Sequence, residues 1–200
     1  MRRFLYLISP NKINRYFYKE LEEVLSSRKV RYFQLRLKGH SNSKLIRIGK
    51  KVKTITKRYK VKLIINDFPL LAKKINADGC HVGQSDSTVI KARKILKNKI
   101  IGVTCHNSKK LIKKAIIDGA DYIALGAFYS TKTKKVRHKA KIKLIKEAKK
   151  ITKIPIVAIG GINLSNYKKL LLNKANFLAI SSYIWKNKKY KPLTAVIKLK

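Results

Sequence analysis

Eight short apolar segments, separated by stretches rich in lysine, constrain the fold of this chain more than any other feature of its sequence. The stretches between them carry apolar residues at helical spacing, as Leu21, Val24 and Leu25 do. The segments lie at residues 4–9, 32–37, 62–66, 79–83, 100–105, 122–128, 154–161 and 177–184. Each has the length of a β-strand, and strands that are apolar throughout are typical of parallel sheets with helical crossovers. The sequence therefore predicts an α/β protein in which strand and helix alternate.

Eight such units close most simply into a (β/α)8 barrel, the TIM barrel. A doubly wound open sheet is the alternative, but open sheets rarely carry eight near-equal units. No long linker rich in Pro, Gly or Ser interrupts the pattern, so residues 1–200 are predicted to form a single TIM-barrel domain. Helix starts are predicted at Ser41 or Asn42, at Ser108 and at Ser165, because these side chains cap exposed backbone N–H groups.

The formal charge of +41, from 50 basic and 9 acidic residues, is compatible with binding to nucleic acid, an anionic membrane or phosphorylated small molecules. The lysines are spread along the whole chain instead of forming one arm, which favours solvated helix faces over a surface dedicated to a polyanion. Nucleic acid is therefore the less favoured partner. Phosphorylated substrates remain compatible with the charge.

Targeting signals and cysteine usage point to the cytoplasm. The first apolar run ends at Ser9 and Pro10, too early for a signal peptide or a membrane span. Cys80 and Cys105 have neither metal-ligand spacing nor the density of a disulfide scaffold. We expect a cytoplasmic protein without a membrane partner.

The end of the second strand segment carries three hydrogen-bond donors. In a barrel, the loops after the strands form the active face. Gln34, Arg36 and Lys38 alternate along an extended segment, so their side chains fall on one face and predict an anion site. The alternative is that Arg36 and Lys38 extend outward into solvent.

Two of the nine acidic residues, Asp67 and Asp86, follow the third and fourth strand segments. Two carboxylates beside Arg and Lys predict a Mg²⁺ site that substrate phosphate oxygens and water would complete. The alternative is a pair of structural salt bridges.

Later strand ends offer groups suited to phosphate. The sixth segment leads into a loop with Thr131, Thr133 and Lys134, and the last two strands end near Gly161 and Ser181. Barrels commonly present backbone N–H groups to a phosphate after the last two strands, although a glycine pair at residues 160–161 is also compatible with a plain turn.

Histidines and cysteines do not form a recognisable catalytic arrangement. His81, His106 and Cys105 lack an orienting acid in the pattern of a Ser-His-Asp or Cys-His site, so structural roles are favoured for all three. Cys80 lies inside a strand segment and is predicted to be part of the core.

Taken together, these motifs resemble the superfamily of thiamine phosphate synthase and thiazole tautomerase over nearly the whole chain. The resemblance rests on Gln34-x-Arg36-x-Lys38, Ile65-Asn66-Asp67, Ala77-Asp78-Gly79-Cys80-His81-Val82-Gly83-Gln84-x-Asp86, Ile101-Gly102-Val103-Thr104-x-His106-Asn107, Asp118-Gly119-Ala120-Asp121-Tyr122, Thr131-x-Thr133-Lys134 and Ala158-Ile159-Gly160-Gly161-Ile162. The chain departs from the family pattern at Leu37, at Ser130 and Lys132, and in the stretch that follows Lys134.

The resemblance to the synthase implies a substrate set and a metal. Hydroxymethylpyrimidine diphosphate would be bound by Gln34, Arg36, Lys38, Asn66, Thr104 and Lys134. Thiazole phosphate would lie against Thr131, Thr133, Gly161, Ile180 and Ser181. Mg²⁺ would be held by Asp67 and Asp86. The implied reaction is dissociative and needs no protein nucleophile, with Mg²⁺, Arg36, Lys38 and Lys134 neutralising the pyrophosphate as it leaves.

Other activities within the same superfamily stay open. Asp86 favours the synthase, whereas His106 is compatible with a tautomerase, and the altered loop after Lys134 is compatible with a non-catalytic phosphate-binding paralogue. A homo-oligomer is also compatible with the sequence.

Overall fold

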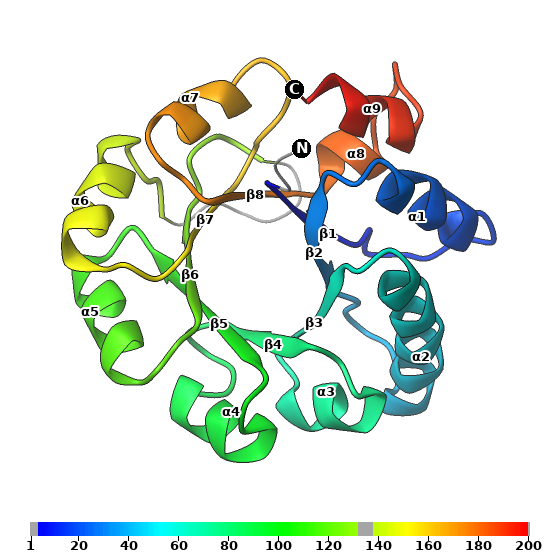
Figure 1. Ribbon diagram of the computed structural model, residues 1–200, viewed down its shortest axis with the longest axis horizontal. Helices are drawn as coiled ribbons and strands as arrows, with labels where there is room; N and C mark the ends of the chain where they lie inside the picture. Colours follow the sequence, from blue (N-terminus) through cyan, green and yellow to red (C-terminus); the bar gives the residue numbers. More distant parts are fainter. Residues whose placement is uncertain (1–3, 132–137, 200) are drawn as a thin grey trace.

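The computed structural model describes residues 4–131 and 138–199, and it is a closed barrel of eight parallel strands surrounded by helices (Figure 1). The strands are β1 (Leu5–Ile8), β2 (Val30–Leu35), β3 (Lys62–Asn66), β4 (Gly79–Val82), β5 (Ile100–His106), β6 (Tyr122–Gly126), β7 (Ile156–Ile159) and β8 (Phe177–Ile180). They neighbour one another in chain order, and β1 pairs with β8 to close the ring. The predicted (β/α)8 barrel is confirmed, and the open-sheet alternative is wrong.

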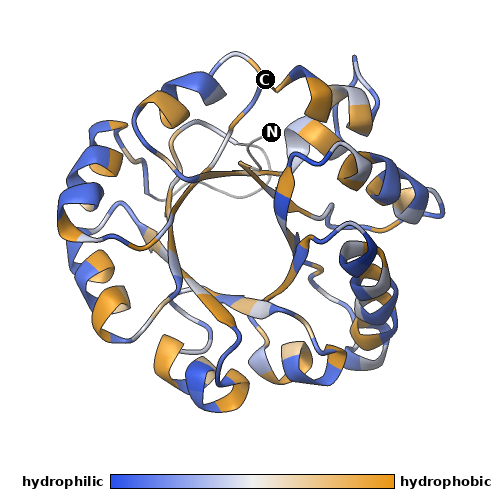
Figure 2. Cartoon of the chain, viewed as in Figure 1, coloured by the Kyte–Doolittle hydropathy of each residue, from blue (hydrophilic) through white to orange (hydrophobic). Residues whose placement is uncertain are grey.

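Helices cover the outside of the barrel and connect successive strands (Figure 1). They are α1 (Phe17–Ser26), α2 (Asn42–Arg58), α3 (Pro69–Ile75), α4 (Val89–Leu96), α5 (Lys109–Ile117), α6 (Lys143–Ile151), α7 (Tyr167–Leu172), α8 (Ser182–Trp185) and α9 (Pro192–Lys198). Figure 2 shows that polar and hydrophobic residues are interspersed along them, and the buried ones include Leu21 and Val24 of α1 and Val52 of α2. Burial of these apolar faces holds the helices against the barrel.

Two boundary predictions are wrong. The segment 177–184 is not one strand, because β8 ends at Ile180 and the short helix α8 begins at Ser182. The indole Nε1 of Trp185 donates to the carbonyl oxygen of Ile8 at 2.7 Å and fixes this helix to β1. Ser165 does not cap α7, because Asn166 precedes the helix and the Ser165 hydroxyl bonds to a neighbouring side chain.

Two cap predictions are confirmed. The hydroxyl oxygen of Ser41 accepts a hydrogen bond from the backbone N–H of Lys44 at the start of α2. The hydroxyl oxygen of Ser108 accepts one from the N–H of Leu111 at the start of α5. Each bond satisfies a donor that the first helical turn leaves without an intrahelical partner.

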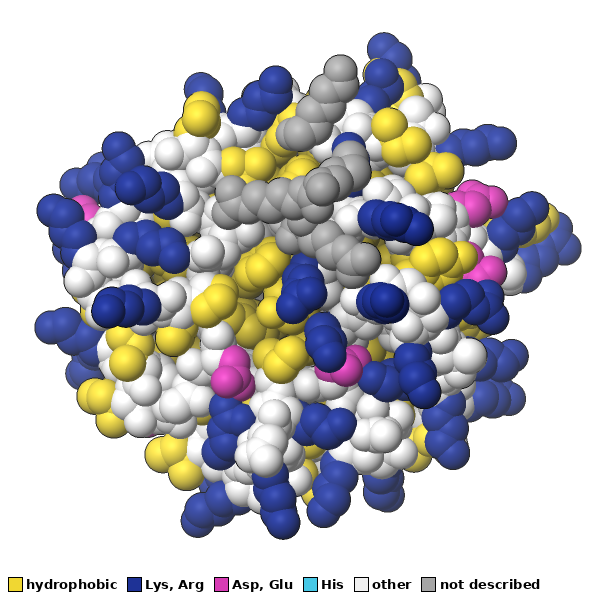
Figure 3. Space-filling view, viewed as in Figure 1, with side chains coloured by type: hydrophobic (Ala, Val, Ile, Leu, Met, Phe, Trp, Pro, Cys, Tyr) yellow, Lys and Arg dark blue, Asp and Glu magenta, His cyan; other side chains and the backbone are white. Residues whose placement is uncertain are grey.

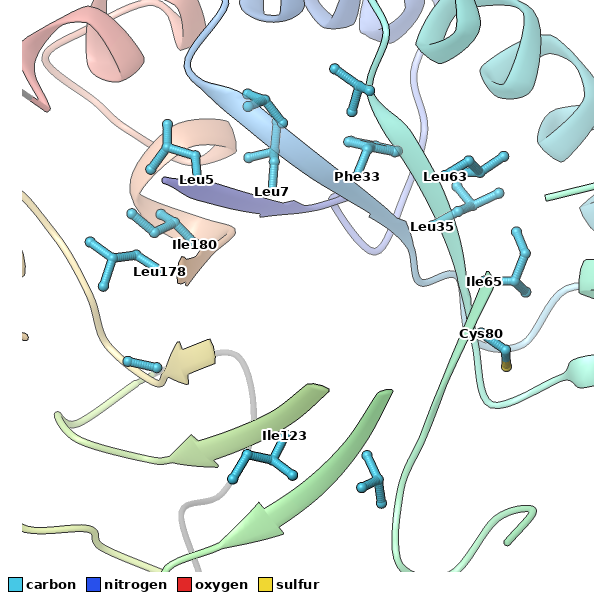
Figure 4. Close-up of a cluster of buried hydrophobic side chains, with 14 of the residues drawn as sticks. Leu5, Leu7, Phe33, Leu35, Leu63, Ile65, Cys80, Ile123, Leu178 and Ile180 are labelled. Carbon is cyan, nitrogen blue, oxygen red and sulfur yellow. The ribbon is translucent and has the colours of Figure 1, made fainter. Parts of the chain in front are cut away.

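The strands bury side chains on both faces, which produces two cores. Figure 4 shows the outer core between strands and helices, with Leu7, Phe33 and Ile65 among its members. Cys80 belongs to this core, as predicted. The inner core fills the barrel and consists of Tyr6, Ile8, Tyr122, Ala124, Val157 and Ala179. Alternation along each strand therefore assigns successive side chains to opposite cores.

The positive charge is spread over the surface. In Figure 3, Lys and Arg side chains surround the visible face on all sides, and only a few acidic side chains lie among them. This distribution fits solvated helix faces better than one polyanion-binding stripe.

A recurring polar contact fixes the amino-terminal ends of three strand pairs. The residue directly before each of β4, β6 and β8 accepts two hydrogen bonds. One comes from a backbone N–H of the preceding strand (β3, β5 or β7), and the other comes from a cationic side chain of the helix that leads into that preceding strand (α2, α4 or α6). The strand bonds run from Leu63 to Asp78 (2.8 Å), from Ile101 to Asp121 (2.7 Å) and from Ile156 to Asn176 (2.9 Å). The cations are Lys53, Arg93 and Lys149. Each contact sets the register between neighbouring strands and ties a helix to the barrel.

Replacing Asp78 by Asn should lower stability. Burial raises the pKa of Asp78, but the hydrogen bonds from Lys53 and from the Leu63 N–H lower it more, so the pKa lies below its usual range. A lowered pKa contributes stability that is present above the unfolded value of about 4 and is lost as the pH falls through the folded value. We expect Asp78→Asn to lose about 1–2 kcal/mol near neutral pH and the loss to shrink in acid.

Denaturant unfolding across a pH series measures this effect. Glu22→Gln is the matched control, because Glu22 pairs with Arg58 at the exposed surface and should change the free energy of unfolding by less than about 0.5 kcal/mol. Equal losses in the two variants would contradict the role given to Asp78.

Candidate active site

Two aspartates lie together at the carboxyl ends of β3 and β4. Asp67 directly follows β3, and its backbone N–H donates to the carbonyl oxygen of His81 at 2.8 Å. Asp86 lies in the loop after β4, where its Oδ2 accepts from the N–H of Gly83 at 3.1 Å. The pKa of Asp67 is raised to about 6, mainly by burial and then by the neighbouring charge of Asp86 and a hydrogen bond with it, while Lys38 and Arg36 lower it. The structure therefore brings the two predicted metal ligands and two predicted phosphate ligands into one site.

This pair fits a magnesium ion by its chemistry. Two carboxylates held against each other repel when both are charged, and a divalent cation between them would relieve that repulsion. Carboxylate oxygens are also the ligands that Mg²⁺ prefers. Residues 4–131 and 138–199 contain no cluster of three or more His, Cys, Asp or Glu side chains suited to a metal. Completion of the site by substrate phosphate oxygens and water stays a prediction, as does the metal itself.

Arg36 is positioned by residues that the sequence pattern did not single out. Strand β2 ends at Leu35, so Arg36 and Lys38 lie just beyond it, whereas Gln34 is buried inside the barrel. The backbone N–H of Arg36 donates to the hydroxyl oxygen of Ser9 at 2.9 Å, and its guanidinium donates to Asn11 at 3.5 Å. Ser9 and Asn11 were detectable only as polar residues that follow the first strand.

Asn66 and Thr104 lie on neighbouring parts of the same face. Asn66 is the last residue of β3 and is in register with His81 of β4. The hydroxyl of Thr104 on β5 lies 2.8 Å from Nε2 of His81, and Nδ1 of His81 lies 2.9 Å from the hydroxyl of Tyr122. His81 is thus a buried, hydrogen-bonded residue, as predicted, and burial lowers its pKa to about 4. Its ring is neutral at physiological pH.

The residues predicted to bind phosphate at the ends of the later strands differ in how they are placed. Thr131 is the last residue described before the gap, and Thr133 and Lys134 lie outside the described residues. The side chain of Ile180 is buried in the outer core, so only its backbone can face a ligand. The hydroxyl of Ser181 donates to the carbonyl oxygen of Ser9 at 3.3 Å, which joins the end of β8 to the end of β1.

Gly161 has a packing role of its own. Its φ is +63°, and a Cβ at this position would collide with the carbonyl oxygen of Ser130. The glycine therefore lets the loop after β6 lie against the end of β7. This requirement explains the residue without a ligand, and its predicted contact with a phosphate stays a prediction.

Cys105 and His106 do not form a nucleophile and base. The Cys105 side chain is buried, and burial raises the pKa of its thiol to about 12, so the thiolate is not available near neutral pH. His106 ends β5, and its ring centre lies 4.5 Å from that of His138. The structural role predicted for Cys105 is supported.

Comparisons with known proteins identify the family of this chain. The family described as "Thiamine monophosphate synthase" matches residues 5–184. A thiamine-phosphate synthase of Pelagibacter ubique (strain HTCC1062) is 68% identical over 200 residues, covering 100% of this chain and 97% of the relative. One from Clostridium acetobutylicum is 39% identical, covering 96% and 92%. The chain belongs to the thiamine monophosphate synthase family.

A solved structure supports the same assignment. The fold resembles that of the thiamine phosphate pyrophosphorylase from Pyrococcus furiosus with a TM-score of 0.87 and 26% identity, covering 98% of this chain and 93% of the other. A 3-hexulose-6-phosphate synthase matches with a TM-score of 0.65 at 15% identity and shares the fold alone. In the described part of this family member, no helix is long and apolar enough to cross a membrane.

Gly83 offers a test of the acidic pair in this member of the family. A Cβ at residue 83 would collide with Oδ2 of Asp86, so Gly83→Ala should displace the carboxylate from its place beside Asp67. If the pair binds Mg²⁺, the variant should bind the ion at least about tenfold more weakly, because losing one good ligand costs more than about 1.4 kcal/mol.

Titration calorimetry with MgCl₂ and pyrophosphate measures this change, with thermal unfolding as a check on folding. Ser85→Ala changes an exposed side chain of the same loop and should bind like the unsubstituted protein. Normal Mg²⁺ affinity in a folded Gly83→Ala protein would argue against Asp86 as a ligand.

Proposed function

We propose that this protein is a Mg²⁺-dependent transferase that joins hydroxymethylpyrimidine diphosphate to thiazole phosphate, giving thiamine phosphate and pyrophosphate. The observation that carries the proposal is the meeting of Asp67 and Asp86 with Arg36 and Lys38 at the carboxyl ends of neighbouring strands. Carboxylates for a metal and cations for a diphosphate are what such a transfer requires. The 68% identity to a curated thiamine-phosphate synthase supports it independently.

The reaction requires stabilisation of the negative charge on the departing diphosphate. The bond between the pyrimidine methylene carbon and the diphosphate oxygen breaks with its electron pair on oxygen, and the thiazole nitrogen then supplies the electrons of the new carbon–nitrogen bond. When bound by Asp67 and Asp86, Mg²⁺ would neutralise part of the negative charge on the diphosphate. Arg36 and Lys38 supply fixed positive charge to the same oxygens, and Lys134 would add to it from the loop after β6.

The remaining predicted site residues bind the two substrates and orient them toward each other. Gln34, Asn66 and Thr104 present amide and hydroxyl groups to the pyrimidine substrate. Thiazole phosphate would lie across the ends of β6 to β8, in contact with Thr131, Thr133, Gly161, Ser181 and the backbone of Ile180. Holding the two substrates face to face removes much of the entropic cost of their encounter. No protein nucleophile is needed, which agrees with the protonated thiol of Cys105.

Incubation of the purified protein with both substrates and MgCl₂ tests the proposal directly. Chromatography should detect thiamine phosphate and an equal amount of pyrophosphate. Omission of Mg²⁺ or addition of a chelator should stop product formation. Absence of product from a folded protein that still binds pyrophosphate would refute the synthase assignment.

Asp86→Asn separates this function from a thiazole tautomerase of the same superfamily. The synthase should lose about a hundredfold or more in kcat, as expected when a group that stabilises developing charge is removed. Asp118→Asn is the matched control, because Asp118 pairs with Lys114 at the end of α5 and should retain full activity. Unchanged turnover in Asp86→Asn would instead favour an activity that does not use this carboxylate.

A further inference from the structure

A chain of buried hydrogen bonds crosses the barrel interior and ends at the candidate site. The hydroxyls of Tyr6 and Tyr122 lie 2.7 Å apart, and the Tyr122 hydroxyl lies 2.9 Å from Nδ1 of His81. Nε2 of His81 then lies 2.8 Å from the Thr104 hydroxyl oxygen. Both tyrosines and His81 are buried, whereas Thr104 is only half-buried at the carboxyl end of β5.

The direction of these bonds follows from counting protons. Within residues 4–131 and 138–199, the hydroxyl of Tyr6 has one hydrogen-bond partner, the hydroxyl of Tyr122. A buried hydroxyl proton without an acceptor is costly, so Tyr6 donates to Tyr122. The proton of Tyr122 then has one acceptor left within reach, which is Nδ1 of His81.

The same count of protons and acceptors determines which ring nitrogen of His81 is protonated. A neutral imidazole carries one proton, and Nδ1 is already an acceptor, so the proton resides on Nε2 and is donated to the oxygen of Thr104. The hydroxyl proton of Thr104 cannot then point back to Nε2. It is free to point elsewhere, and Thr104 is half-buried near the carboxyl end of β5, the end of the barrel at which Asp67 and Asp86 follow their strands.

The reverse direction leaves a defect. If Thr104 donated to Nε2, then Nδ1 would donate to Tyr122 and Tyr122 to Tyr6. The proton of Tyr6 would be left in the inner core without an acceptor among the described residues. The forward direction is therefore the one in which every buried proton of the chain has an acceptor.

We propose that His81 is a positioning residue, which Tyr122 holds as the Nε2–H tautomer so that the hydroxyl of Thr104 donates its proton to the bound diphosphate. His81 does not touch the substrate in this arrangement. The proposal rests on the proposed function for the identity of the ligand, but the tautomer is a property of the protein alone. Proposal and function can therefore fail separately.

Nitrogen NMR of the full chain labelled with ¹⁵N-histidine tests the tautomer without any substrate. The signals of His81 are identified among those of the four histidines by their absence from a His81→Gln variant. His81 should show a protonated Nε2 and an unprotonated Nδ1 across the neutral pH range. A protonated Nδ1 would overturn the proposal even if the protein makes thiamine phosphate.

Binding of pyrophosphate in the presence of MgCl₂ tests whether the hydroxyl of Thr104 donates to the ligand. Thr104→Ser keeps the hydroxyl and should bind within about twofold of the unsubstituted protein, whereas Thr104→Val removes the donor and should bind about tenfold more weakly. Equal binding by the two variants would contradict the donor role of Thr104.

Tyr122→Phe tests the link through the histidine. It removes the donor to Nδ1, so both tautomers should appear in the NMR spectrum and pyrophosphate should bind several-fold more weakly. Combined with Thr104→Val, it should weaken binding little further, because both substitutions break one linkage. Additive losses would indicate that Tyr122 acts on binding by a separate route.

Tyr32→Phe is the matched control. Its ring packs 6.0 Å from that of Tyr122 in the same core, but its hydroxyl is not a member of the chain of hydrogen bonds. It should leave the His81 tautomer and the binding of pyrophosphate unchanged. If it shifts the tautomer as Tyr122→Phe does, packing and not the hydroxyl controls the ring. Thermal unfolding identifies any variant that fails to fold, and the NMR spectrum of the unsubstituted protein decides the proposal in that case.

Discussion

The packing of Tyr122 across Gly102 inside the barrel is the contact on which the interior depends. A Cβ at residue 102 would collide with the aromatic ring of Tyr122, so the ring occupies space that any other residue at 102 would fill. The rings of Tyr6 and Tyr32 pack against it at 5.7 and 6.0 Å. A closed eight-stranded barrel must fill its centre with side chains, and three tyrosines from three strands are among those that do so here. Asp67 lies near Asp86 because the two residues follow β3 and β4, which are paired neighbours in this sheet.

Acidic residues are scarce in this chain, and their locations show what the fold requires. Asp78 and Asp121 join strands to helices at the amino-terminal end of the barrel. Each accepts one hydrogen bond from a backbone N–H and one from a cationic side chain. Asp67 and Asp86 lie at the opposite end, against each other. With 41 excess positive charges, a carboxylate could find a cation almost anywhere on this surface. Two carboxylates held beside each other are therefore unexpected on electrostatic grounds, and this is why the pair indicates a ligand site.

The sequence predicted the barrel because strand and helix periodicities differ and repeat eight times along the chain. It also located the ends of strands, where Asp67, Asp86, Arg36 and Thr104 do gather on one side. Sequence could not reveal that Ser9 holds the backbone of Arg36, because that contact joins residues 27 positions apart in sequence. The sequence also could not reveal that a Cβ at Gly161 would collide with the carbonyl oxygen of Ser130, a packing requirement that stands beside the predicted ligand contact of this residue.

The polar groups inside the barrel are the part of the interior that an apolar pattern would least predict. Burying the polar atoms of Tyr6, Tyr122 and His81 costs free energy that their hydrogen bonds to one another and to Thr104 offset. Apolar side chains of similar volume would fill the same space without that cost, so packing alone does not explain these residues. Their hydrogen bonds have a direction, however, and packing does not. The chain of hydrogen bonds begins at the buried hydroxyl of Tyr6 and ends at half-buried Thr104. The packed interior of the barrel therefore sets the orientation of a hydroxyl group at the end where the strands finish. The core of this protein thus fixes a proton position as well as a shape.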